Sequence, residues 1–123
     1  MRDTRNDIIA YIDGASRGNP GPAAAGFTLT DSAGTQLQAK AFFLGEATNN
    51  IAEYTSLVKA LEAAKKIGAE QLMVFSDSEL LVRQINGEYR VKSKLLKPFF
   101  EQAVSLLGSF RNWQEIFGNE PDD

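Results

Sequence analysis

Residues 7–31 read DIIAYIDGASRGNPGPAAAGFTLTD and decide the fold of the chain. The short apolar run at 7–12 predicts a buried strand. Residues 13–22 hold three glycines and two prolines, a composition typical of a turn-rich loop. A second strand is predicted over 23–31. A third, over 35–44, follows through Ser32, Ala33 and Gly34 and completes an antiparallel hairpin.

The remainder of the chain alternates between helix and strand patterns. Thr48, Asn49 and Asn50 are candidate caps for a helix whose apolar residues run from Tyr54 to Ala64, and Gly68 marks its expected end. The segments after it predict a strand at 71–76, a helix at 78–85, a helix at 95–107 and a strand at 112–117. This order indicates an α/β fold with a five-stranded sheet, in which the strands at 7–12 and 71–76 could lie parallel at the centre.

Composition restricts the chemistry more sharply than it restricts the fold. The chain has 123 residues, no cysteine and no histidine. Thiol catalysis, histidine bases and histidine metal sites are therefore excluded, and any hydrolysis must use carboxylates, with Mg²⁺ the expected kind of cation. The net charge of −3 argues mildly against nucleic acid as a partner. No segment approaches the about 20 apolar residues of a membrane helix, so we expect one cytoplasmic domain without membrane contact.

Three acids stand at positions where a sheet edge would bring them together. Asp13 ends the first predicted strand and Asp77 ends the fourth, so parallel pairing would place both at one carboxyl edge. Glu53 is expected in the first turn of the long helix, beside its apolar seam. Each acid alone also has a structural explanation. Asp13 could form a turn, Glu53 could complement the helix dipole, and Asp77 could cap a helix.

The motifs together resemble ribonuclease H of type 1. The resemblance rests on YIDGASRGNPGPAAAG (11–26), TNNIAEYTSLVKALEAA (48–64), FSDSELLVRQINGEYRVK (75–92) and LKPFFEQ (96–102), which cover most of the chain in the family's order. It implies a ribonuclease H-like fold, an α/β architecture whose five-stranded mixed sheet has its first three strands antiparallel and is flanked by helices.

The resemblance also implies an activity. The chain would be an endonuclease that hydrolyses the RNA strand of RNA–DNA hybrids and leaves 5′-phosphate and 3′-hydroxyl ends. Asp13, Glu53 and Asp77 would hold a pair of Mg²⁺ or Mn²⁺ ions about 3.5–4 Å apart. The partner would be the hybrid duplex, and the protein is expected to be a monomer.

Further residues match positions at which the family contacts the hybrid. Thr48 would meet a DNA-strand phosphate, and Asn49 and Asn50 would lie in the minor groove, although Asn50 could also cap the helix. Other expected substrate contacts are Gly14, Arg17, Gly18, Asn19, Ser78 and Glu79. Such a surface reads groove shape and 2′-hydroxyls, and is largely sequence-tolerant. A basic concentration could meet the phosphate backbone or form an ordinary solvated surface: Arg83, Arg90, Lys92, Lys94 and Lys97.

The chain departs from the family at its C-terminal end. The family usually supplies a fourth acid at the start of a final helix, after a loop that carries a histidine. We expect residues 1–123 to form a single domain without that helix, with Asn119 as a neutral substitute for the acid. Glu120, Asp122 and Asp123 are the alternatives, and a frayed terminus is a further one.

This departure leaves more than one function open. We expect reduced hydrolysis, with a preference for Mn²⁺. The main alternative is a module that binds hybrid or RNA without cleaving it. A third possibility is a related nuclease with the same fold, such as an exonuclease or an integrase-like enzyme.

Overall fold

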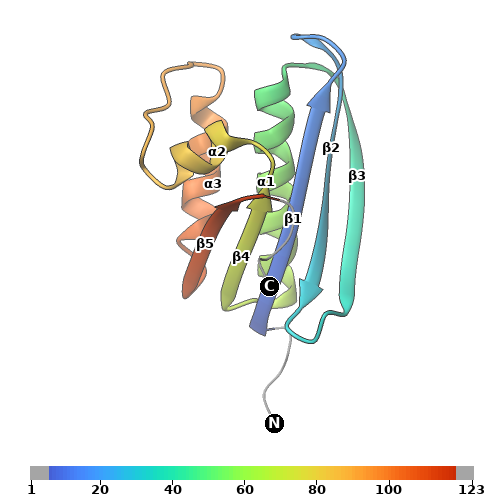
Figure 1. Cartoon of the computed structure of the whole chain (residues 1–123), viewed down its shortest axis with the longest axis vertical. Helices are drawn as coiled ribbons and strands as arrows, with labels where there is room; N and C mark the ends of the chain where they lie inside the picture. Colours follow the sequence, from blue (N-terminus) through green and yellow to red (C-terminus); the bar gives the residue numbers. More distant parts are fainter. Residues whose placement is uncertain (1–5, 119–123) are drawn as a thin grey trace.

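The computed structural model describes residues 6–118, which form one five-stranded mixed sheet with its helices (Figure 1). The strands are β1 (Asp7–Ser16), β2 (Gly21–Asp31), β3 (Gln36–Ala47), β4 (Gln71–Ser76) and β5 (Asn112–Phe117). Their order across the sheet is β3-β2-β1-β4-β5. β1, β2 and β3 are antiparallel, whereas β4 lies parallel to both β1 and β5. The predicted fold class and the central parallel pair are thus confirmed.

β1 is longer than the sequence predicts, and this places Asp13 within the strand. Its parallel pairing with β4 ends where Ile12 faces Ser76. Its antiparallel pairing with β2 continues as far as Ser16, opposite Ala23. The prediction of a loop over 13–22 is therefore wrong in extent, because the backbone groups of its first residues are satisfied by β2. The peptide bond between Asn19 and Pro20, in the short connection that remains, is cis.

The helices are α1 (Asn49–Ile67), α2 (Glu79–Ile85) and α3 (Lys97–Leu107), and α1 and α3 lie behind the sheet in Figure 1. Thr48 caps α1, since its hydroxyl accepts a hydrogen bond from the backbone N–H of Ile51. Capping by Asn50 is therefore not observed. Gly68 ends α1 in the left-handed conformation, as predicted. α3 begins two residues later than the predicted Leu95. None of these helices has the length and apolar character to cross a lipid bilayer.

The core lies between α1 and the sheet. Alternate residues of β1, namely Ile8, Ala10 and Ile12, point toward α1 and are buried. Leu57 and Leu61 of α1 meet them with no exposed surface. Complete burial of a leucine side chain contributes about 1.5–3 kcal/mol relative to exposure, so this layer fixes how α1 sits on β1.

Glu115 is the one residue of β5 that is buried, and its carboxyl group has no polar partner there. Only 5% of its surface is exposed, and neither carboxylate oxygen has a hydrogen-bond partner. Burial raises the pKa of Glu115 well above its usual value. A folded state that holds this proton more tightly than the unfolded chain loses stability as pH rises above the unfolded pKa.

Replacing Glu115 with Gln is expected to stabilise the protein in alkaline solution. Relative to the parent, the free energy of unfolding of Glu115→Gln should rise by about 1–3 kcal/mol between pH 5 and pH 8, because the folded parent keeps a proton that its unfolded chain releases, and Gln carries no such proton. The difference should shrink toward pH 5, near the ordinary pKa of a glutamate, where the unfolded chain keeps more of this proton. Urea unfolding across this range measures both quantities. Glu101→Gln, on the exposed surface of α3, is the matched control. Equal slopes against pH for parent and Glu115→Gln would contradict the assignment.

Candidate active site

The end of the parallel pairing between β1 and β4 forms a notch at the carboxyl edge of the sheet. β1 continues past Ile12 alongside β2, whereas β4 stops at Ser76. Asp13 lies between two residues buried against α1, so its side chain stands on the opposite face of the sheet. Asp13 and Asp77 both line an open depression of about 500 Å³ on that face. The predicted meeting of these two acids at one edge is confirmed.

Glu53 reaches the notch from α1. Its Oε1 accepts a hydrogen bond of 3.3 Å from the backbone N–H of Gly14, whereas its Oε2 is buried without a partner. The pKa of Glu53 rises from 4.5 to about 7. Burial is the largest cause and the N–H of Gly14 opposes it, while the negative charges of Asp13 and Asp77 raise the pKa further. All three acids therefore share one electrostatic environment.

The donors at the notch suit a divalent cation in type and in charge. Glu53 brings a buried oxygen without a partner, and the charges of the exposed Asp13 and Asp77 act on the same carboxyl. Carboxylate oxygen is the ligand that Mg²⁺ prefers, and a cation would relieve both the desolvation and the repulsion. Between residues 6 and 118, however, no three acidic, histidine or cysteine side chains are already grouped closely enough to hold a metal ion. The charges of the three acids affect one another, but their side chains do not form a preformed metal site.

Two structural explanations for these acids do not hold. The first turn of α1 contains no acidic residue, so the expected position of Glu53 in that turn is wrong and the helix dipole does not explain it. The N-cap of α2 is Ser78, whose hydroxyl accepts from the N–H of Leu81, and not Asp77. Asp77 is therefore not needed to begin the helix.

Gly14 makes the close approach of β1 and α1 possible. A Cβ placed on Gly14 would lie 2.3 Å from the carbonyl carbon and oxygen of Ala52, and 2.6 Å from the backbone nitrogen of Glu53. Gly14 is itself buried. It was expected as a substrate contact, which stays a prediction. The observed role of Gly14 is to bring the backbone of α1, and with it Glu53, against the strand.

The expected substrate residues of the β1–β2 connection are tied to the start of α1. The side-chain oxygen of Asn49 accepts a 2.6 Å hydrogen bond from the N–H of Ser16, and the N–H of Asn49 donates to Asn19 at 3.1 Å. Arg17, Gly18, Asn19, Asn49 and Asn50 are all exposed, and Thr48 is half-buried. The structure thus brings the GNPGP loop (residues 18–22) and the TNN segment (residues 48–50) together on one surface.

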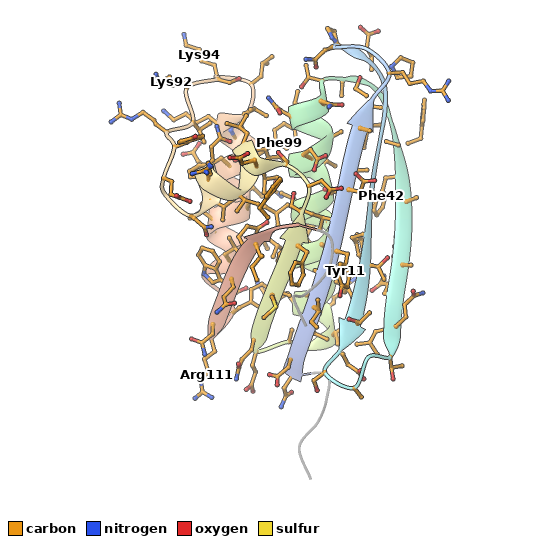
Figure 2. The ribbon with its side chains drawn as sticks, viewed as in Figure 1. Tyr11, Phe42, Lys92, Lys94, Phe99 and Arg111 are labelled. Atoms are coloured by element: carbon orange, nitrogen blue, oxygen red, sulfur yellow. The ribbon has the colours of Figure 1, made fainter. Side chains whose placement is uncertain are left out.

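The other predicted contacts, Ser78 and Glu79, lie at the start of α2, and the predicted basic residues follow along the chain. Ser78 is half-buried by its capping role, and Glu79 accepts a 2.8 Å hydrogen bond from Arg83. The connection between α2 and α3 carries exposed Arg90, Lys92 and Lys94. In Figures 1 and 2 this connection and the β1–β2 loop lie at the same end, with Lys92 and Lys94 pointing outward.

Some predicted site residues lie outside the described residues, and one buried polar contact was not predicted. Asn119 and its alternatives Glu120, Asp122 and Asp123 follow the last described residue, Gly118, so their roles stay predictions. A buried hydrogen bond of 2.6 Å from the Tyr54 hydroxyl to Gln84 was not predicted. The signal available was a polar residue within the apolar pattern of α2.

Comparisons with known proteins agree with this geometry. A family model described as reverse transcriptase-like matches residues 11–118. Ribonuclease HI of Halobacterium salinarum is 40% identical over 111 residues, which are 90% of this chain and 56% of that protein. The Rv2228c protein of Mycobacterium tuberculosis, described as bifunctional, is 41% identical over 105 residues, 85% of this chain and 29% of its own length. The chain thus spans about half, or less, of these curated relatives.

Solved structures give the same assignment. The crystal structure of the H. salinarum enzyme matches with a TM-score of 0.87 and 38% identity, covering 91% of this chain and 85% of that one. LC11-RNase H1, solved in complex with an RNA/DNA hybrid, matches with a TM-score of 0.85 and 39% identity, over 90% and 84% of the two chains. Fold and site together define a ribonuclease H-like domain. The chain belongs to the ribonuclease H type 1 family.

Substituting Gly14 with Ala is expected to separate β1 from α1. The new methyl group meets backbone that cannot move aside cheaply, so Gly14→Ala should lower the free energy of unfolding by about 1–3 kcal/mol. Thermal and urea unfolding measure the loss. Gly108→Ala serves as the control, because the same addition there meets its nearest atom at 3.4 Å. Equal stability of Gly14→Ala and Gly108→Ala would contradict the close contact between Gly14 and the backbone of α1.

The pKa of Glu53 should fall when either neighbouring charge is removed. Asp13→Asn and Asp77→Asn each take away a negative charge that disfavours ionisation of Glu53. Carbon-detected NMR titration of the glutamate carboxyls measures the effect, starting from a value of about 7. Glu62→Gln, on an exposed part of α1, is the control and should leave this pKa in place. An unchanged pKa in Asp13→Asn would mean that the two acids are not neighbours.

Proposed function

We propose that the chain is a divalent-metal-dependent endonuclease that hydrolyses the RNA strand of RNA–DNA hybrids. The observation that carries the proposal is the buried, unpartnered oxygen of Glu53, whose carboxyl is acted on by the charges of Asp13 and Asp77. Membership of the ribonuclease H type 1 family supports it, as does the similarity to a ribonuclease H1 solved with an RNA/DNA hybrid.

Asp13, Glu53 and Asp77 are the residues that would hold Mg²⁺ or Mn²⁺. When bound, such ions supply Lewis-acid chemistry for phosphodiester hydrolysis, which requires no histidine. The protein's own contribution is positional. The N–H of Gly14 donates to one oxygen of Glu53, and the core that packs α1 on β1 keeps the other oxygen buried without a partner. Products with 5′-phosphate and 3′-hydroxyl ends belong to the same proposal.

Hybrid binding is assigned to the surface around the start of α1. The N-terminal end of a long helix carries a partial positive charge that favours phosphate, and the start of α1 is hydrogen-bonded to the loop between β1 and β2. Asn19 and Asn49 hold this surface in shape, and the exposed Arg90, Lys92 and Lys94 add positive charge at the same end of the molecule. We expect binding to weaken steeply with salt, because phosphate contacts release counterions.

Metal-dependent cleavage of a labelled hybrid tests the proposal. The parent protein should cut the RNA strand with Mg²⁺ or Mn²⁺ and stop cutting when EDTA is added. Asp13→Asn should reduce the rate by about 100-fold or more, since a metal contributes several kcal/mol to the transition state. Glu62→Gln, remote from the notch, should cut at the parental rate.

The choice of substrate separates the proposal from its alternatives. Duplex RNA and duplex DNA are assayed beside the hybrid, and ligation of the products reports their end groups. Binding of hybrid without cleavage in either metal would contradict the proposal and favour a non-catalytic binding module. Cleavage of duplex DNA at the same rate would place the chain with nucleases of different specificity.

A further inference from the structure

Tyr54 and Gln84 form a buried polar contact that the proposed chemistry does not use. The Tyr54 hydroxyl donates to Oε1 of Gln84 at 2.6 Å, with 1% of Tyr54 and 5% of Gln84 exposed. Polar groups buried this deeply are costly unless they are satisfied by each other. The contact therefore restricts the distance between the two helices that carry it.

Those two helices each adjoin an acid of the notch. Tyr54 directly follows Glu53 on α1, and successive helical residues point about 100° apart. Glu53 faces Gly14 on β1, while Tyr54 faces α2. α2 begins at Glu79, after the cap Ser78 that directly follows Asp77. The hydrogen bond between Tyr54 and Gln84 thus links the helix of Glu53 to the helix that starts beside Asp77.

The α2 side of this link is anchored to the sheet. The side-chain amide of Asn86, at the end of α2, donates to the backbone oxygen of Glu115 at 3.1 Å. The N–H of Gly118, beyond the end of β5, donates to the backbone oxygen of Ser76 at 2.9 Å, one residue before Asp77. α2 is therefore held to the same strands that place Asp77.

Glu53 has little else to fix its side chain. The bond from Gly14 is long at 3.3 Å, and its second oxygen has no partner. The place of its carboxylate therefore depends on the position of α1 as a whole. Outer groups that orient a ligand commonly change metal affinity by about 10–100-fold when they are removed.

We propose that Tyr54 and Gln84 are positioning residues that hold Glu53 where it meets a divalent cation together with Asp13 and Asp77. Neither residue touches the cation or the substrate, and both act through the placement of α1 against α2. The inference rests on the proposed function, because it takes Glu53 as a residue that faces the metal.

The variants Tyr54→Phe, Gln84→Met and the double variant separate positioning from stability. Each single variant leaves one buried polar group unsatisfied and should lower the melting temperature. The double variant removes both groups and keeps the shapes, so its stability should return close to that of the parent. If the hydrogen bond positions Glu53, the affinity for Mn²⁺ should stay about tenfold or more below the parental value even in the double variant.

Calorimetric titration with Mn²⁺ alone measures that affinity, and the Mg²⁺ concentration for half-maximal hybrid cleavage gives a second readout. Tyr89→Phe is the matched control, because it removes the hydroxyl of a tyrosine that is 49% exposed. Parental Mn²⁺ affinity in the double variant, or in folded single variants, would overturn the inference while leaving the proposed function intact. Failure of the parent to bind Mn²⁺ and to cleave hybrid would instead overturn both.

Discussion

The distance between β1 and the second turn of α1 governs the rest of the structure. At Gly14 the strand comes so close to Ala52 and Glu53 that no side chain fits between them. This contact delivers Glu53 to the sheet edge, where its carboxylate meets only one backbone N–H. The contact also fixes where α1 packs on the core, because Leu57 and Leu61 lie one and two turns farther along the same face of the helix. A wider gap would leave Asp13 and Asp77 without their third neighbour.

Residues 6–118 contain two buried glutamates, Glu53 and Glu115, in which burial disfavours the charged form, and their surroundings differ. Glu53 lies beside two exposed acids, Asp13 and Asp77, whose negative charges raise its pKa further, and a cation would relieve this repulsion. Glu115 lies on the helix side of β5, and burial alone accounts for its raised pKa. Burial raises the pKa of Tyr54, and the negative charge of the nearby Glu115 raises it further. One site is thus suited to a ligand, and the other limits stability at high pH.

Much of the architecture follows from local sequence, because hydrophobic period and turn residues specify each element separately. The strand at 112–117, the cap at Thr48 and the stop at Gly68 were predicted from near neighbours alone. The cap of α2 was not, because Ser78 fills the position suggested for Asp77. The length of β1 could not be predicted in this way, since Asp13 to Ser16 are held by pairing with β2 and not by their own propensity. The link from Tyr54 to Gln84 spans 30 positions, so only the folded chain reveals it. The site acids were identified by a motif, whereas the burial of Glu53 required the coordinates.

We infer that Glu53 ionises against a cation that it shares with Asp13 and Asp77. The most direct test is the pKa of Glu53 measured by NMR with and without saturating Mg²⁺. A cation at the notch favours the charged carboxylate, so the account predicts that Mg²⁺ lowers this pKa well below its metal-free value of about 7. A pKa that stays near 7 with Mg²⁺ present would contradict the account, because the buried oxygen of Glu53 would then face no ion.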